Sequence, residues 1–191
     1  MRKIATILVV VIFILGAVFG YKKLIKDGNQ KETNSSDNTQ QNLTIKVSSP
    51  KFAEGATIPI EYTCDDENIN PPLSISGVPK EAKSLALIVD DPDAAFGTFA
   101  HWVLWNIFPD TTEIKERETP VGAAVGKNDF NLEKYRGPCP PNSIHRYFFR
   151  IYALDTILTL PAGSYREDLL KSIKGHVIAE GQLMGKYSRY Q

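Results

Sequence analysis

The sequence predicts a mainly β domain with short peripheral helices, preceded by an apolar N-terminal segment. Segments rich in β-branched and aromatic residues recur between turns, a pattern that is typical of strands. The 12 prolines and 13 glycines are scattered along the chain and supply many turn positions. Only one segment spaces its apolar residues as a surface helix does.

Residues 1–26 differ in kind from the rest of the chain. Met-Arg-Lys is followed by 17 residues without a charge, residues 4–20, and then by a second basic cluster. This run is at the long end for a secretory signal and at the short end for a membrane span of about 20 residues. We expect an uncleaved membrane anchor with the domain outside the cytoplasm. The alternative is a cleaved signal, which would leave the domain secreted.

Residues 27–42 contain no apolar side chain, and the one glycine among them has no side chain at all. Such a segment cannot bury enough surface to offset the entropy that ordering costs. We therefore expect a disordered polar linker, which tethers the folded domain of residues 43–191 to the N-terminal segment.

Two strands are expected early in the domain. Residues 43–47 alternate apolar and polar side chains, as a half-buried strand does. Residues 57–63 also read as a strand, but Pro59 cannot donate a ladder hydrogen bond. This second segment is therefore expected at the edge of a sheet.

Four further strands are expected in the rest of the domain. Residues 84–90 and 99–107 are apolar on both faces, which is typical of central strands. Residues 146–154 are rich in aromatic side chains, and residues 177–187 form the last segment with strand character.

One helix is expected between the last two strands. Ser164 and Glu167 stand three residues apart, as the two members of a capping box do. Apolar residues follow at helical spacing, and Gly175 ends the helix.

The balance of charge excludes one class of partner. Lys and Arg together number 22, and Asp and Glu together also number 22. Proteins that bind nucleic acid carry a basic patch or stripe, so no nucleic-acid partner is expected. The two cysteines are too few for a disulfide scaffold or a four-cysteine zinc site.

Two histidines lie in segments that are otherwise apolar. His101 and His145 each come near the start of an expected strand, beside turns rich in Pro and Gly. Because side chains alternate along a strand, His145 shares a face with Tyr147, and His101 is expected to share one with Phe99 and Val103. Strand ends of this kind often form the mouths of pockets.

The loops beside the histidines are suited to a ligand. Residues 90–97 supply carboxylates, and the prolines of residues 137–141 restrict the backbone. A restricted loop holds its N–H and C=O groups in place. The sequence contains neither the nucleophile elbow of hydrolases nor a phosphate-cradling P-loop. We therefore expect a binding role without catalytic residues.

Four stretches of the domain resemble signatures of the phosphatidylethanolamine-binding protein family, in its prokaryotic, Raf-kinase-inhibitor-like (YbhB/YbcL-type) members. The family is characterised by an Asp-Pro-Asp motif with a following His strand, and by Gly-x-His-Arg after a Gly-Pro-rich loop. The matching stretches are DDPDAAFGTFAHWVLWNI at 90–107, YRGPCPPNSIHRYFFRIYAL at 135–154, YTCDDENINPPLSISGVP at 62–79 and KGHVIAEGQLMGKYSR at 174–189.

The resemblance implies a fold of two antiparallel β-sheets with a small anion pocket at one end. Matched residue by residue, the ligand-binding positions are Asp91, His101, Pro138, His145 and Tyr147. Two positions depart from the family pattern, since Ala95 replaces a proline and Ser143 replaces a glycine. Neither change removes a polar pocket residue.

The expected ligand is a phosphate-containing small molecule or a lipid headgroup. Imidazoles, a phenol and loop amides can all donate hydrogen bonds to phosphate oxygens. Asp91 would orient a histidine, or accept a hydrogen bond from a protonated phosphate or an amine headgroup. Asp93 and Arg146 are assigned to a structural ion pair between the two motifs. A kinase or protease partner is a further expectation from the resemblance, and no cofactor is expected.

Several alternatives stay open at this point. The same His/Asp pocket, or Cys139 with His145 as its base, would make a hydrolase. Two histidines and one aspartate would make a zinc site, although no metal-ligand spacing supports it and no metal is expected. A protein-interaction role at the membrane would leave the pocket unused. Cys64 and Cys139 could pair in an oxidising compartment or stay as free buried thiols.

Overall fold

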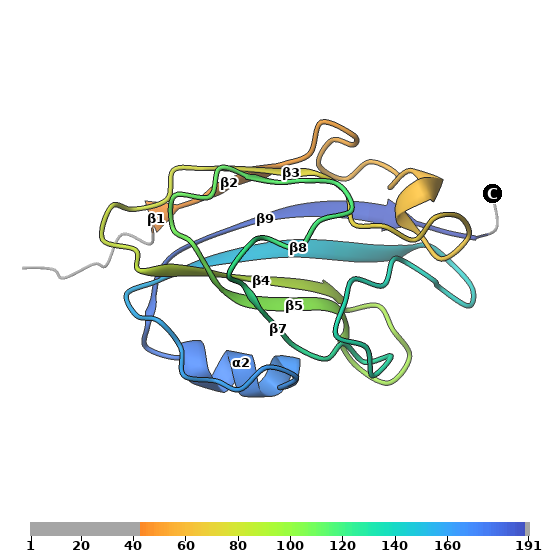
Figure 1. The fold of residues 1–191 in the computed structure, drawn as a ribbon. Helices are drawn as coiled ribbons and strands as arrows, with labels where there is room; N and C mark the ends of the chain where they lie inside the picture. Colours follow the sequence, from red (N-terminus) through yellow and green to blue (C-terminus); the bar gives the residue numbers. More distant parts are fainter. Residues whose placement is uncertain (1–42, 190–191) are drawn as a thin grey trace, which may run out of the picture. The chain divides into compact units, whose positions relative to one another are not determined.

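Two sheets and one helix form three layers in residues 43–189, the part of the chain that the computed structural model describes (Figure 1). The six-stranded sheet has the order β1-β9-β8-β4-β5-β7, and the three-stranded sheet has the order β2-β3-β6. The strands are β1 (Leu43–Thr44), β2 (Lys46–Ser48), β3 (Leu73–Ser76), β4 (Ser84–Asp91), β5 (Phe99–Ile107), β6 (Glu113–Ile114), β7 (Ala124–Val125), β8 (His145–Leu154) and β9 (Val177–Tyr187). The helix α2 spans Arg166–Ile173, and the 3₁₀ helix η1 spans Ile60–Tyr62.

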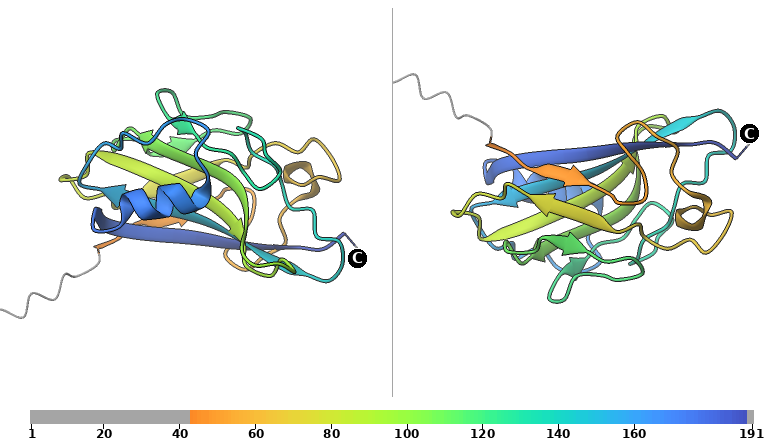
Figure 2. Two further views of the ribbon diagram at one scale, coloured as in Figure 1. Left: turned by 90° about the horizontal axis from the view of Figure 1, so that it is seen from below. Right: turned by 90° about the horizontal axis from the view of Figure 1, so that it is seen from above.

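The large sheet is covered on both faces, and this explains the apolar character of its central strands. Every residue of β4 is buried. One hydrophobic cluster, which includes Trp102 and Phe149, fills the space between the two sheets. A second cluster, which includes Trp105 and Leu169, lies beneath α2. Figure 2 shows α2 across one face of the large sheet and β2 and β3 across the other.

The expectation of a mainly β fold with two sheets is confirmed, and four expected strands occur as β4, β5, β8 and β9. All neighbouring strands pair antiparallel except β1 and β9, which pair parallel. Short peripheral helices were expected. In the described residues, these are the single α-helix α2 and the short 3₁₀ helix η1.

The expected edge strand at residues 57–63 is wrong. Only Thr57 forms a bridge, to Lys186 of β9. After Pro59 the chain turns into η1, where the N–H of Tyr62 donates to the carbonyl of Pro59 at 3.0 Å. Proline fixes φ near −65°, which suits the first turn of a helix as well as an extended segment. The sequence pattern did not distinguish these two outcomes.

The expected strand at residues 43–47 is split between the two sheets. Thr44 pairs with Glu180 of β9, whereas Val47 pairs with Ile75 of β3. The chain changes sheets at Ile45, whose backbone passes very close to Gly181. A β-carbon on residue 181 would overlap the carbonyl of Ile45. Glycine at position 181 therefore permits the crossing.

The start of α2 also differs from the expectation. Ser164 does not cap the helix, because its hydroxyl donates to the carbonyl of Pro161 at 2.7 Å. The helix begins one residue later, and the carboxylate of Asp168 accepts the backbone N–H of Tyr165 at 3.3 Å. Asp168, and not Glu167, thus takes the second role in the capping interaction.

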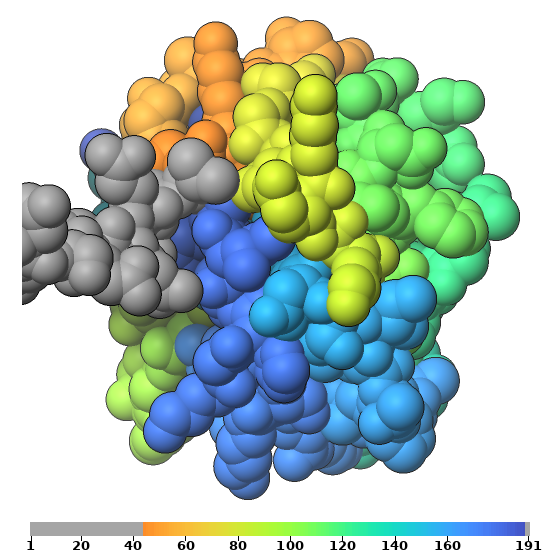
Figure 3. Space-filling model, turned by 90° about the vertical axis from the view of Figure 1, so that its left-hand side faces the viewer, coloured from red at the N-terminus to blue at the C-terminus, as the bar shows by residue number. Residues whose placement is uncertain are grey.

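The expected membrane segment at residues 1–26 and the expected linker at 27–42 lie outside the described residues. Across residues 43–189, no helix has the length and apolar content that crossing a membrane requires. Figure 3 shows the end of the domain that faces left in Figure 1, where the segments after β3 (yellow), β5 (green) and β8 (blue) come together.

We predict that Gly181→Ala destabilises the domain by about 3 kcal/mol, because the added methyl group meets backbone and not a movable side chain. Urea denaturation measures the loss. Gly97→Ala is the control, since nothing lies within 4 Å of its β-carbon position and only its φ of 110° opposes alanine, at a cost of about 1 kcal/mol. Equal losses in the two variants would contradict the prediction.

Candidate functional site

The residues expected in the pocket gather at the right-hand end of the large sheet in Figure 1. β4 ends there at Asp91, and β5 and β8 begin there, because both run antiparallel to β4. The pairing therefore brings His101 of β5 and His145 and Tyr147 of β8 to the same end as Asp91. The Pro-rich loop that precedes β8 enters at this end as well.

Asp91 and His145 form the buried centre of the site. Nδ1 of His145 lies 2.7 Å from Oδ2 of Asp91, and the two side chains are only 7% and 5% exposed. A carboxylate accepts hydrogen bonds, so Nδ1 of the imidazole carries a proton and Nε2 is the ring nitrogen left for other partners. Asp91 thus orients His145, which is one of the two roles that the sequence analysis gave it.

His101 occupies a β-bulge, which the sequence analysis missed. Val89 pairs with Trp102 but the next residue, Asp90, pairs with Ala100, so His101 is an extra residue in β5. The bulge breaks the alternation of side chains. His101 therefore packs on the same side as Tyr147, at 5.2 Å between ring centroids, while Val103 belongs to the cluster under α2. The expectation that His101 and Val103 share a face is wrong for this reason.

Burial makes His101 a weak base. Its Nδ1 lies 2.7 Å from the carbonyl oxygen of Arg136, and since a carbonyl only accepts, Nδ1 carries the proton. The rings of Phe99, Phe130 and Tyr147 surround the imidazole. Desolvation lowers the pKa of His101, while the Arg136 carbonyl and the charge of Asp91 partly oppose this shift.

The hydroxyl of Tyr147 is a buried polar group that lacks a hydrogen bond of normal geometry. The ring stacks near His145, with centroids 6.5 Å apart. Burial raises the pKa of Tyr147, and the nearby charge of Asp91 raises it further, while the backbone amide of Cys139 acts in the opposite direction. Such a hydroxyl stays protonated and can donate to a ligand.

Pro138 lies in a loop that a disulfide holds in place. Cys64 and Cys139 are bonded to each other, and the N–H of Cys64 donates to the carbonyl of Pro138 at 3.0 Å. The pairing excludes free thiols at these two positions. It also removes the nucleophile from the hydrolase alternative that relied on Cys139.

Asp93 and Arg146 form an ion pair on the surface beside the site. Oδ1 of Asp93 accepts from Nη2 of Arg146 at 2.6 Å, and Oδ2 accepts from Nε at 2.8 Å. Oδ2 also accepts the backbone N–H of Arg146. The Arg146 guanidinium is the main cause that lowers the pKa of Asp93 to about 2. The pair ties the loop after β4 to the start of β8.

A second charged cluster on the opposite face of the sheet escaped the sequence analysis. Asp90 points away from Asp91 and lies between Arg150, at 3.4 Å, and Arg166, at 3.3 Å. Burial raises the pKa of Asp90, and the two arginines oppose that shift. Two consecutive acidic residues in one strand must face opposite ways, and this was the signal available in the sequence.

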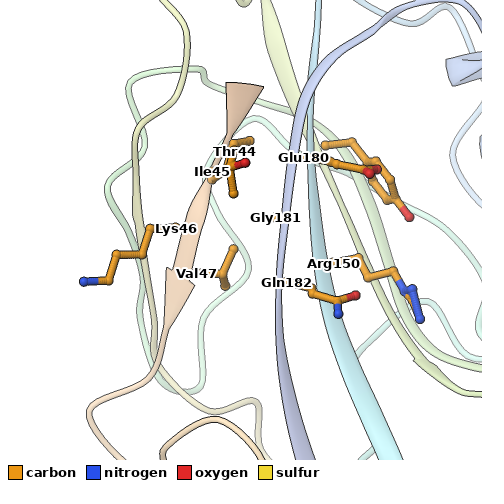
Figure 4. A pocket seen from close by; sticks show the side chains of 9 residues that line it. Thr44, Ile45, Lys46, Val47, Arg150, Glu180, Gly181 and Gln182 are labelled. Atoms are coloured by element: carbon orange, nitrogen blue, oxygen red, sulfur yellow. The ribbon is translucent and has the colours of Figure 1, made fainter. Parts of the chain in front are cut away.

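A cavity of about 450 Å³ lies near this second cluster and not at the histidines (Figure 4). It borders β1, β2, β8 and β9, and its charged lining residues are Lys46, Arg150 and Glu180. Arg150 already pairs with Asp90, and Lys46 points away from the other labelled side chains in Figure 4. The two basic residues of the lining are therefore poorly placed to bind an anion, and the third charged residue, Glu180, is itself acidic.

The zinc alternative receives no support from the geometry. Within residues 43–189, no three His, Cys, Asp or Glu side chains come together in a way that could hold a metal ion.

Comparison with known proteins identifies the family. The family model for phosphatidylethanolamine-binding proteins matches residues 48–188. The chain belongs to this family. It is 53% identical over 143 residues to a UPF0098 protein of Methanothermobacter thermautotrophicus, a match that covers 72% of this chain and 95% of the relative. It is 46% identical over 159 residues to a UPF0098 protein of Pyrococcus horikoshii, covering 78% of this chain and 79% of that one.

Two crystal structures share the fold. A phosphatidylethanolamine-binding protein homologue from Chlamydia trachomatis is 40% identical, with a TM-score of 0.73 over 76% of this chain and 98% of that chain. YbcL of Escherichia coli, described as a member of the mammalian family, is 28% identical, with a TM-score of 0.72 over 75% and 98%. Because the match spans almost all of both crystallised chains, the family domain can be studied by itself.

We predict that Asp93→Asn lowers the urea midpoint at neutral pH, because it removes the negative charge that pairs with the Arg146 guanidinium. The asparagine side chain keeps an oxygen that can accept the backbone N–H of Arg146. The folded pKa of about 2 lies below the ordinary value of 3.8, so the ion pair stabilises the fold above about pH 4, and the effect fades as the pH falls towards 2. Urea titrations of both proteins between pH 7 and pH 2.5 test this. A difference in midpoint that is independent of pH would contradict it.

An exposed histidine is half protonated at about pH 6.5. We predict that the protonation midpoint of His101 lies below this pH, because burial lowers its pKa. NMR titration of the imidazole resonances between pH 8 and pH 4.5 measures this. Because the unfolded chain binds this proton more readily than the folded one, His101 also makes the free energy of unfolding fall as the pH drops below about 6.5. A midpoint at or above 6.5 for His101 would contradict the prediction.

Proposed function

We propose that this chain is a binding protein whose pocket holds a phosphate group, either on a small phosphorylated molecule or on a lipid headgroup. The pocket consists of Asp91, His101, Pro138, His145 and Tyr147. Membership of the phosphatidylethanolamine-binding protein family supports a binding function. The choice of a phosphate ligand follows from the family resemblance, and the chemistry of the side chains is consistent with it.

The observation that carries the proposal is that both imidazoles use Nδ1 for internal hydrogen bonds. His145 bonds Asp91, and His101 bonds the carbonyl of Arg136, each at 2.7 Å. Each ring is thereby held in one orientation, with Nε2 left for an external partner. The hydroxyl of Tyr147, buried beside both rings, is a third polar group at this place, and it lacks a hydrogen bond of normal geometry. Buried polar groups of this kind call for a ligand or water.

The two histidines differ in what they offer to such a partner. When His145 carries a proton on both ring nitrogens, the carboxylate of Asp91 compensates the charge, and Nε2 can donate to an anionic oxygen. Burial lowers the pKa of His101, so its Nε2 is an acceptor at neutral pH. A monoprotonated phosphate group has both an anionic oxygen and a P–OH donor. It matches this pair of one donor and one acceptor.

Two further parts of the proposal concern context. A phosphorylated residue of a kinase or protease partner would bind in the same pocket, and the protein would regulate its partner through this contact.

The disulfide between Cys64 and Cys139 is of a kind that persists in oxidising compartments. It supports a domain outside the cytoplasm, either anchored to the membrane or secreted.

We predict that phosphate, phosphoethanolamine and O-phosphotyrosine shift the imidazole resonances of His101 and His145 together and saturably at millimolar concentrations or below. Isotope-labelled domain, residues 43–191, is titrated and followed by NMR. His145→Gln is expected to weaken binding at least tenfold, since a hydrogen bond to an anionic oxygen contributes about 1.5–3 kcal/mol.

The matched control is the third histidine of the chain. His176 lies outside the site and bonds Asp155 at 2.8 Å, so its resonance should stay still and His176→Gln should bind as wild type. Liposomes that carry phosphatidylethanolamine, compared with free phosphoethanolamine, distinguish a lipid source from a soluble one. The absence of any shift at millimolar ligand would remove the proposal.

A hydrolase that uses His145 is the second candidate, and one observation favours it. The Asp91–His145 hydrogen bond has the form of the pair that orients a general base. Turnover of p-nitrophenyl phosphate or p-nitrophenyl acetate that disappears in His145→Ala, with the fold intact, would establish this activity in place of simple binding.

A further inference from the structure

The segment from Arg136 to Cys139 forms one wall of the pocket through its backbone. The carbonyl of Arg136 fixes His101, and the backbone of Gly137 also acts on that ring. The backbone of Cys139 also influences Tyr147, whose pKa it lowers against the larger effect of burial. A displacement of this segment would therefore change the orientation of one imidazole and the surroundings of the phenol at the same time.

This wall has few hydrogen bonds of its own. Three of the five residues at positions 137–141 are prolines, which have no N–H. The N–H of Gly137 donates to the side chain of Asn68 at 2.7 Å. The segment belongs to no strand. Its position therefore depends on what holds it from outside.

One hydrogen bond comes from β5, where the N–H of Arg136 donates to the carbonyl of His101 at 3.1 Å. The other contacts come from the segment of residues 62–68. Cys64 is bonded covalently to Cys139, and its N–H donates to the carbonyl of Pro138 at 3.0 Å. Asn68 accepts from Gly137. A β-carbon on Gly137 would overlap the carbonyl of Tyr62, so the two backbones touch. The cysteines are 75 residues apart in sequence, so nothing local can replace the covalent link.

We propose that the Cys64–Cys139 disulfide and Asn68 are positioning residues for the pocket, and that reduction of the disulfide weakens its affinity for phosphate groups. This inference rests on the proposed function, because it concerns the affinity of that same site. The physical reason is preorganisation: a loop that must be ordered by the ligand binds more weakly than one already in place.

The redox step is an ordinary thiol–disulfide exchange with a dithiol. One thiolate of the dithiol attacks a sulfur of the bridge and forms a mixed disulfide, and its second thiol then displaces the protein sulfur. The protein gains two electrons and two protons as Cys64 and Cys139 become thiols, and the dithiol leaves as its own disulfide. Both cysteines are only half-buried, so a small reductant can reach them.

The test compares three states of the same domain. Phosphoethanolamine affinity is measured by calorimetry on the oxidised protein, on protein reduced with dithiothreitol, and on protein reoxidised afterwards. We expect affinity to fall at least tenfold on reduction and to return on reoxidation. The double variant Cys64→Ala/Cys139→Ala should bind as weakly as the reduced protein and should not respond to dithiothreitol.

A second variant separates positioning from global stability. Asn68 has a φ of 61°, a conformation that glycine adopts freely, so Asn68→Gly keeps the backbone and removes only the side chain that holds Gly137. We expect several-fold weaker binding with the disulfide intact and the folded state retained, as the unshifted His176 resonance would show. If the reduced protein unfolds, the affinity of this variant still decides whether the contacts of residues 62–68 with the loop set the affinity of the site.

The outcomes distinguish the two proposals. Failure of the oxidised wild type to bind phosphoethanolamine or phosphate would overturn the proposed function itself. Binding by the oxidised protein that survives reduction unchanged, with the fold intact, would overturn only the positioning role of the disulfide. Wild-type affinity in Asn68→Gly would overturn the role of Asn68.

Discussion

The antiparallel pairing of β4 with β8 is the constraint on which the site depends. It lays the Asp-Asp-Pro-Asp sequence alongside the residues that begin β8. Asp91 then meets His145 on one face of the sheet, and Asp90 meets Arg150 on the other. A slip of one residue would send each carboxylate to the wrong face and leave it buried without its partner. The register of the sheet and the geometry of the site are therefore specified together.

Two irregular features, a bulge and a Pro-rich loop segment, determine the position and the tautomer of His101. The bulge at His101 turns a side chain that would lie under α2 towards Tyr147. The Pro-rich wall, held by the disulfide, supplies the carbonyl that sets the tautomer of the same histidine. Neither feature contributes to the ladder of the sheet. Both act on the few atoms that a ligand would contact, which is where departures from regular structure are most often found.

The sequence was most informative where burial is complete and least informative at edges and caps. The central strands were predicted closely because both of their faces are covered, so their side chains are apolar throughout. The segment of residues 57–63 was mistaken for a strand, because its pattern suits an extended chain and a 3₁₀ turn after Pro59 equally well. The start of α2 was misplaced by one residue because the hydroxyl of Ser164 had another acceptor within reach.

The sequence by itself determined the β class of the domain, the family resemblance and the set of polar residues that the structure brings to one end of the sheet. These follow from residue types and their spacing, which are local properties. The tertiary structure decided the face on which His101 lies, the pairing of the two cysteines and the role of Asp90. Each of these depends on contacts between segments far apart in the chain, and a bulge or a disulfide leaves no periodic signal in the residues that form it.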